Sequence, residues 1–170
     1  MSEPIIREAS PADAGALHEY LVELIGEDLS TITLASRPST VEQLQAVLRQ
    51  YAELNNSVFL LAILDNKIVG QLDFQGGWHP KKRHAGGISV STHRDYRGHG
   101  IGTRLVESLF EWVSSNPIVT RVELEVLSNN QRALDLYTRL GFTVEGTKKG
   151  AVIVDGKPVD NILMARMFPN

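Results

Sequence analysis

The sequence predicts a single α/β domain over residues 1–170, with a mixed central sheet of about seven strands and about four helices. Three observations support this prediction: hairpin-like pairs of apolar runs, two early helical stripes, and a strand–helix–strand unit in the middle of the chain. The length fits one domain, and no internal repeat, low-complexity tract or linker is visible. We therefore expect antiparallel hairpins at both ends of the sheet and one crossover between them.

The first part of the chain predicts one strand and two helices. Residues 5–9 are typical of a short strand, and residues 10–13 (Ser-Pro-Ala-Asp) combine an N-cap residue, a proline at the first helical position and an acid three residues after the cap. Apolar residues then recur at helical spacing until Gly26, which we expect to end this helix. Residues 26–39 show no period and predict an irregular connection. A second capping box begins at Ser39 and precedes the helical stripe of Leu44, Val47, Leu48, Tyr51 and Leu54.

The middle of the chain changes to strand-like patterns. Residues 58–64 and 67–74 flank the turn dipeptide Asp65-Asn66, and this arrangement predicts an antiparallel hairpin. Residues 76–83 are rich in glycine and basic side chains and predict a loop. A further strand is expected over residues 84–90.

The last part of the chain completes the crossover and closes the sheet. A helix from Ile101 to about Asn116 is expected from the spacing of Ile101, Leu105, Leu109 and Trp112, and residues 119–127 predict a strand. Ala133, Leu136, Tyr137 and Leu140 mark a last helix that ends at Gly141. The closing strands are expected over residues 142–145, 151–154 and 159–167.

Composition excludes several classes of protein. The chain has no cysteine, so a disulfide framework, a thiolate nucleophile and a cysteine-based zinc site are excluded. The net charge of −3 argues against a general nucleic-acid binder. Neither a secretory signal nor an apolar stretch of membrane-spanning length is visible. We therefore expect a cytoplasmic protein that binds neither nucleic acid nor membrane, with no metal site because the histidines lack ligand spacing.

A glycine-rich run, Arg-Gly-His-Gly-Ile-Gly at residues 97–102, joins the strand ending near Val90 to the helix starting at Ile101. The first backbone N–H groups of a helix lack internal partners and carry partial positive charge, so they bind phosphate well. The three glycines leave no side chain to hold a ligand away from the backbone. Arg97 adds a cation, so the run predicts a phosphate-binding loop.

Two other nucleotide-binding patterns fit this run less well. A dinucleotide-binding fingerprint requires glycine or alanine where Thr103 stands, although Glu123 or Glu125 lies at the spacing of its ribose-binding acid. Helices and a hairpin also precede this strand–loop–helix unit, whereas a dinucleotide-binding domain is expected to begin with it. The phosphate loop of nucleotide hydrolases requires Gly-Lys-Ser or Gly-Lys-Thr, which the sequence lacks.

A second motif lies downstream of the glycine run. Residues 124–130 read LEVLSNN, Ala133 follows, and residues 136–142 read LYTRLGF. With residues 88–90 and 96–102, these segments resemble the GNAT superfamily of N-acetyltransferases. The signature of that family is a strand, R/Q-x-x-G-x-G/A, a helix, a second strand, and then N-x-x-A-x-x-L-Y followed by G-F.

The resemblance extends over nearly the whole chain and implies a fold, a reaction and a site. Its C-terminal part is similar to bacterial branches that acetylate ribosomal proteins, polyamines or small amines. The implied reaction moves an acetyl group from acetyl-CoA to a primary amine by direct attack in a ternary complex, with no metal. The implied cofactor-binding residues are Ile88, Ser89, Val90, Arg97, Gly98, His99, Gly100, Ile101, Gly102, Thr103 and Asn130.

The resemblance also implies two catalytic side chains, and each has an ordinary structural explanation. Tyr137 matches a tyrosine beside the thioester sulfur, where a phenol stabilises the leaving thiolate, yet its helical spacing also fits core packing. Glu125 matches a catalytic glutamate of ribosomal-protein acetyltransferases, and it requires a raised pKa to act as a base. The alternative interpretation is that Glu125 simply belongs to a solvated face of its strand. Asn130 also suits a helix cap. The N–H of Val90 is the expected donor to the developing oxyanion.

The acceptor is left open between a small-molecule amine and a protein or peptide amine. In the family, the acceptor side is built from the segment between the first two helices and from the last strands, which here are residues 26–39 and 146–159. Glu27 and Asp28 are acidic, which would attract a cationic amine but is also ordinary for a surface. A non-catalytic acetyl-CoA-binding regulatory module remains the alternative function, and a homodimer remains open.

Overall fold

A seven-stranded sheet organises the part of the chain that the structure, a computed structural model, describes, namely residues 3–25 and 39–169. The strand order is β1-β2-β3-β4-β5-β7-β6, and each neighbouring pair is antiparallel except β4 and β5. This order confirms the predicted hairpins and the crossover between them. The strands are β1 (Ile5–Glu8), β2 (Val58–Leu64), β3 (Lys67–Gly76), β4 (Ala85–Thr92), β5 (Arg121–Leu127), β6 (Thr143–Val154) and β7 (Lys157–Met167).

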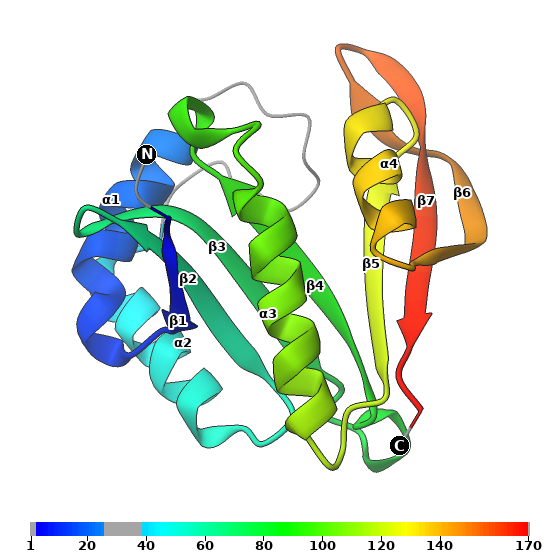
Figure 1. Ribbon diagram of the computed structural model, residues 1–170. Helices are drawn as coiled ribbons and strands as arrows, with labels where there is room; N and C mark the ends of the chain where they lie inside the picture. The colour runs from blue at the N-terminus through cyan, green and yellow to red at the C-terminus, as the bar shows by residue number, and fades with distance from the viewer. Residues whose placement is uncertain (1–2, 26–38, 170) are drawn as a thin grey trace.

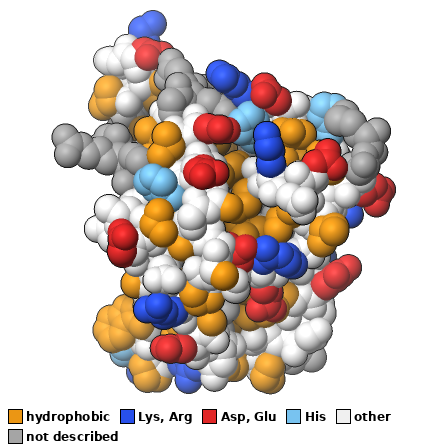
Figure 2. Space-filling view, turned by 90° about the vertical axis from the view of Figure 1, so that its left-hand side faces the viewer, with side chains coloured by type: hydrophobic (Ala, Val, Ile, Leu, Met, Phe, Trp, Pro, Cys, Tyr) orange, Lys and Arg blue, Asp and Glu red, His pale blue; other side chains and the backbone are white. Residues whose placement is uncertain are grey.

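Helices cover both faces of the sheet. α1 (Ala14–Ile25) and α2 (Val41–Glu53) lie on one face over β2 and β3, and Figure 1 shows α3 (Ile101–Ser115) and α4 (Gln131–Arg139) on the other. Each face has its own apolar core, because side chains alternate across a strand. Leu61 of β2 packs with the α1 and α2 leucines, whereas Phe74 of β3 packs with those of α3. Figure 2 shows the α1 side, where acidic, basic and apolar side chains are intermixed.

Local sequence signals explain where the helices begin. Three residues of 3-10 helix, Pro11–Asp13, lead into α1, which agrees with the predicted start. The cap of α2 lies one residue later than predicted: Thr40 Oγ1, not Ser39, accepts from Gln43 N at 3.2 Å, and Gln43 Oε1 accepts from Thr40 N at 2.9 Å. The predicted helix end at Gly26 and the predicted connection over 26–38 lie outside the described residues.

The closing strands differ from the prediction in one respect. Residues 142–145 and 151–154 were expected as two strands, but one strand, β6, spans both. Its pairing with β7 shifts register between Val144 and Gly146 and again between Lys148 and Val152. Such irregularities are common at sheet edges, where they bend a strand without ending it.

The parallel pair β4 and β5 is short, and this feature positions the site. Ala85–Gly87 pair with Arg121–Glu123, and no further pairing between these strands is present among the described residues. Figure 1 shows the strands diverging towards the end that carries the glycine-rich run and α4. The divergence leaves backbone groups of both strands without a ladder partner.

Candidate active site

Two cavities meet where β4 and β5 diverge. One has a volume of about 690 Å³ and extends from the glycine-rich run to α1, and the other, of about 480 Å³, extends towards β5, β6 and β7. Volumes of this size are typical of small-molecule sites. The residues that line both cavities are Ser89, Val90, Asn130, Ala133 and Tyr137.

The backbone of β4 presents hydrogen-bonding groups to this opening. In an antiparallel ladder, alternate residues direct their N–H and C=O groups to opposite sides of the strand. His93 N donates to Val69 O at 3.0 Å and Gly77 N to Ala85 O at 2.9 Å, so the odd-numbered residues of β4 bond β3. The N–H and C=O groups of Ile88 and Val90 therefore face β5, at a level where β5 no longer pairs with them.

The glycine-rich run forms one end of the larger cavity. Gly98 and Gly100 have φ angles of 83° and 78°, which residues with a side chain rarely adopt, and Gly100 is the N-cap of α3. The first N–H groups of α3 therefore point out of the helix beside Arg97, whose Nε donates to Thr92 O at 3.1 Å. All the predicted loop residues except His99 line this cavity: Arg97, Gly98, Gly100, Ile101, Gly102 and Thr103. His99 is exposed and its Nδ1 lies 3.3 Å from Tyr96 O.

α4 places two predicted side chains on the opposite wall. Asn130 is the N-cap of α4, where its Oδ1 accepts from Ala133 N at 3.2 Å, and its Nδ2 has no bond among the described residues. Both roles weighed for Asn130 are thus compatible, because the cap uses one end of the amide. Burial raises the pKa of Tyr137 to about 12, and its hydroxyl has no described hydrogen-bond partner. Its ring packs edge-on against Phe142 at 5.6 Å.

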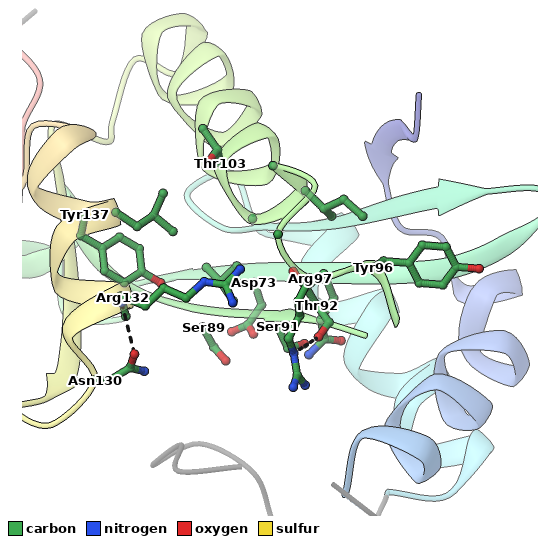
Figure 3. A pocket seen from close by; sticks show the side chains of 18 of the residues that line it. Asp73, Ser89, Ser91, Thr92, Tyr96, Arg97, Thr103, Asn130, Arg132 and Tyr137 are labelled. Atoms are coloured by element: carbon green, nitrogen blue, oxygen red, sulfur yellow. Dashed lines mark hydrogen bonds between the residues drawn. The ribbon is translucent and has the colours of Figure 1, made fainter. Parts of the chain in front are cut away.

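Arg132 is a basic residue of this site that the sequence analysis did not identify. It lines the larger cavity from the first turn of α4, and Figure 3 shows its side chain reaching towards the glycine-rich run. Its Nη2 lies 4.0 Å from the position that a Cβ on Gly98 would occupy. The sequence contained a signal for Arg132, because this residue lies two positions after Asn130, the N-cap of α4. A side chain in the first turn of a helix can contact the same ligand as the N-cap residue.

Glu125 lies in the smaller cavity but lacks the raised pKa that its predicted role requires. Its Oε1 accepts from Lys148 Nζ at 2.7 Å, and its Oε2 accepts from Asn161 Nδ2. Lys148 above all, with Asn161 in addition, holds the pKa of Glu125 below its ordinary value. A carboxylate stabilised in its charged form is a weak proton acceptor, so the condition for this role is not met, and the role of Glu125 as base stays a prediction.

A polar niche on the other side of Ser89 was not predicted. It consists of Gln71 and Asp73 on β3 and of Ser89 and Ser91 opposite them on β4, all of which line the larger cavity. Asp73 accepts from Tyr51 Oη at 3.3 Å and is hydrogen-bonded to Ser89. Burial raises the pKa of Asp73 to about 6, and these hydrogen bonds offset only part of that effect. Figure 3 shows Asp73, Ser89 and Ser91 together beneath the glycine-rich run.

Two further findings concern what the described residues do not contain. Within residues 3–25 and 39–169, no three His, Asp or Glu side chains gather closely enough to hold a metal ion. None of the described helices combines the length and the apolar character that a membrane crossing needs.

Comparisons with known proteins agree with this geometry. The sequence matches the model of the acetyltransferase (GNAT) family over residues 22–142. It is 29% identical over 108 residues to the L-amino acid N-acetyltransferase AaaT of Escherichia coli, covering 64% of this chain and 67% of that protein. The structure of a GNAT-family acetyltransferase from Streptococcus pneumoniae superposes with a TM-score of 0.93 at 30% identity, covering 98% of this chain and all of that one.

A further structural likeness concerns the fold alone. The structure of yncA from Salmonella typhimurium, which holds its cofactor acetyl-CoA, superposes with a TM-score of 0.85 at 21% identity. The match covers 99% of this chain and 96% of that one.

Proposed function

This chain belongs to the acetyltransferase (GNAT) family, and on that premise we propose that its joined cavities transfer an acetyl group from acetyl-CoA to a primary amine. One observation supports this most strongly. The unpaired backbone of β4, the N-terminus of α3 and the hydroxyl of Tyr137 all face the same opening. A long thioester that carries phosphate groups would use the β4 backbone for its arm, the helix N-terminus for its phosphates and the hydroxyl for its sulfur.

The residues around the opening fit acetyl-CoA. Ile88 and Val90 would pair through their backbone with the amide-bearing arm, as an added strand pairs with a sheet edge. The glycine-rich run from Arg97 to Thr103 would hold the pyrophosphate on the first N–H groups of α3, with Arg132 as a second cation. Asn130 would bond the arm through its Nδ2, which the cap leaves available.

The chemistry divides among three groups of this chain. Bound acetyl-CoA supplies the acetyl group as a thioester, which a neutral amine attacks directly. The Val90 N–H, which faces the opening, donates to the carbonyl oxygen as negative charge develops there. Tyr137 donates its hydroxyl proton to the sulfur as the carbon–sulfur bond breaks. A base must take the proton that the ammonium form of the acceptor carries, because only the neutral amine has a lone pair to attack.

We expect the purified protein to release free thiol from acetyl-CoA when a primary amine is present. A panel of amines, followed by thiol release and by detection of the acetylated product, measures this directly. Binding of acetyl-CoA without turnover across a broad panel would instead favour the non-catalytic regulatory module. Thermal stabilisation by NAD but not by acetyl-CoA would contradict the proposed function itself.

Replacing Gly100 with alanine is expected to weaken acetyl-CoA binding about tenfold, because a Cβ at its φ of 78° strains the phosphate-binding loop. Gly156, in the turn between β6 and β7, has a φ of 74° and is the matched control. An added Cβ meets nothing within 4 Å at either position, so both variants lose similar stability from backbone strain. Calorimetric titration should show weaker binding for Gly100→Ala alone. Equal binding by both variants would remove the loop from the cofactor site.

The relatives are named for acceptors of two classes, small molecules and a ribosomal protein, so we propose only a primary amine as the acceptor. AaaT is named for L-amino acids, and other relatives are named for ribosomal-protein alanine and for aminoglycosides. The cytoplasmic location and the homodimer stay predictions.

A further inference from the structure

Two side chains of the polar niche, Gln71 and Asp73, lie directly beside an apolar part of the sheet. Gln71 and Asp73 pair across β2 with Leu61 and Phe59, both of which belong to the core beneath α1 and α2. Polar side chains in such a position are costly to bury unless their hydrogen bonds are made. Their presence therefore requires a reason other than packing.

Gln71 is the clearest sign that a ligand belongs in this niche. Gln71 as a whole residue is 8% exposed, and its Oε1 has no hydrogen-bond partner among the described residues. The group is an acceptor, so what it lacks is a donor. Asp73 beside it on β3 is also an acceptor, and both side chains line the larger cavity. Two neighbouring acceptors suit a ligand group that carries several N–H donors.

The niche adjoins the reacting end of the proposed site. Asp73 pairs with Ser89 across the ladder, and Leu72 pairs with Val90, whose N–H faces the opening. Ser89 lines both cavities and is the neighbour of Val90 in β4. A group held by Asp73, opposite Ser89, therefore lies close to the proposed oxyanion donor. The niche therefore lies where the nucleophile of the acceptor is needed.

The charges around the niche favour a ligand that carries an ammonium group and no neighbouring carboxylate. The smaller cavity, which joins at Ser89, is lined by three carboxylates and two cations: Glu123, Glu125, Glu145, Arg121 and Lys148. Arg121 pairs with both Glu123 and Glu145, and Lys148 pairs with Glu125, so neither cation is left for an added carboxylate. The larger cavity is also lined by Arg97, Arg132 and Arg139, of which Arg97 and Arg132 are assigned to the pyrophosphate. With Asp73 and Arg139 counted, the acceptor side has four carboxylates and three cations.

We propose that Gln71 and Asp73 form the acceptor subsite, that they bind the ammonium group of an amine with no carboxylate beside it, and that Asp73 takes the proton from that ammonium. The proposal rests on the acetyl-transfer function proposed above. Asp73 is then a catalytic residue in place of Glu125, and Gln71 orients the amine. Amines of this class include simple primary amines and the N-terminus of a peptide, whose neighbouring carbonyl is an uncharged amide.

The proton and electron balance of this step is complete. One ammonium proton passes to the Asp73 carboxylate and from there to solvent. The freed nitrogen lone pair forms the bond to the acetyl carbon, and the carbon–sulfur bond breaks with its electron pair on sulfur. The sulfur receives a proton through Tyr137, whose hydroxyl is restored by the second proton lost from nitrogen. The net reaction converts an ammonium and a thioester into an amide, a thiol and one proton.

The titratable neighbours of Asp73 leave it free to act as a base near neutral pH. Tyr51 of α2 bonds Asp73, and Tyr20 of α1 lies 2.9 Å from Ser91 Oγ, where either hydroxyl can donate. The pKa of Tyr51 is raised by burial and by the charge of Asp73, so Tyr51 stays protonated. No described Lys, Arg or His forms an ion pair with Asp73.

A binding experiment that needs no turnover tests the subsite. Tyramine, L-tyrosinamide and L-tyrosine share a ring and differ at one position, which is hydrogen, a neutral amide or a carboxylate. Each is titrated into protein saturated with free coenzyme A, so that no reaction occurs. We expect tyramine and tyrosinamide to bind at least about tenfold more tightly than tyrosine. Equal or tighter binding of tyrosine, or no binding of any of the three, would overturn the proposal.

Three variants then assign the roles. Asp73→Asn should lower kcat/KM by about 10- to 100-fold near neutral pH, and the loss should shrink as pH rises and free amine accumulates. Gln71→Leu should raise the KM for the amine with little change in kcat, yet raise the melting temperature, because it removes an unpaired buried oxygen. Glu19→Gln removes an exposed carboxylate of α1 that lines neither cavity, and this control should keep the pH profile of the native protein.

Failure of the subsite and failure of the proposed function are distinguishable. Acetyl transfer that continues unchanged in Asp73→Asn would leave the function intact and remove Asp73 from it. Tyramine binding that depends on Asp73 and Gln71, without any transfer, would leave the subsite intact and contradict the function. A Gln71→Leu variant that loses stability would show that Gln71 is structural, and would overturn its part in the subsite.

Discussion

Replacing Tyr137 with phenylalanine is expected to lower kcat for acetyl transfer by about 10²- to 10³-fold while leaving acetyl-CoA affinity nearly unchanged. The variant removes one hydroxyl that lines both cavities and has no described hydrogen-bond partner. The ring and its edge-on contact with Phe142 remain, so the free energy of unfolding should change by less than about 0.5 kcal/mol. Loss of rate without loss of binding or stability is the signature of a group that acts only in the transition state.

The raised pKa of Tyr137 defines how this hydroxyl acts. At a pKa of about 12, full transfer of its proton to a thiolate with a pKa of about 8.5 is uphill by about 5 kcal/mol. Tyr137 therefore cannot give up its proton ahead of bond breaking. It donates a hydrogen bond to the sulfur and passes its proton on only as it receives one from nitrogen. Because its pKa is raised, kcat should show no loss from ionisation of Tyr137 up to about pH 10.

Tyr96→Phe is the matched control for this prediction. Tyr96 also lines the larger cavity, but Figure 3 shows its hydroxyl directed away from Tyr137 and from the opening. Steady-state kinetics for both variants, with calorimetric titration of acetyl-CoA, separate the two tyrosines. Unchanged turnover in Tyr137→Phe would remove Tyr137 from the leaving-group role. An equal loss in Tyr96→Phe would point to a general disturbance of the cavity.

The cofactor side of the site was predictable because its signals are local. A run of glycines before a helix, or an asparagine at a helix cap, is defined within one short segment, and its geometry follows from backbone rules. The structure accordingly places nearly all of those residues around one cavity. Arg132 was missed although its signal was local too, since it stands in the first turn after Asn130.

The acceptor side was not predictable in the same way, because its properties depend on residues far apart in sequence. Gln71 and Asp73 alternate with Leu72 and Phe74, a pattern typical of a strand with one solvated face. Only the packing of α1 and α2 over β3 buries that face. Likewise, the spacing in β5 placed Glu125 on the correct face, but its pairing with Lys148 arises through β6 and β7.

Replacing Asp73 with asparagine is expected to raise the free energy of unfolding at pH 7 by about 2–3 kcal/mol. Burial raises the pKa of Asp73 from 3.8 to about 6, so the folded state binds its proton more tightly than the unfolded state does. Well below pH 3.8 both states are protonated and the difference between variant and native protein should vanish, and it grows as pH rises from about 4 to about 6. As pH rises through about 6, the native protein loses stability that the variant keeps, and above pH 7 the difference should level off.

Urea unfolding of both proteins between pH 4 and pH 8 measures this difference, and subtraction cancels the other titrating groups. Asp13→Asn is a control of opposite sign. Arg7, 2.6 Å away, lowers the pKa of Asp13 to about 2, so Asp13 stabilises the fold above pH 4 and its loss should destabilise it. A difference for Asp73→Asn that is flat with pH would show that its carboxyl is not held in a raised-pKa state. A rise with pH would instead mean that the native fold carries a destabilising carboxylate, which selection retains only where that carboxylate has a task.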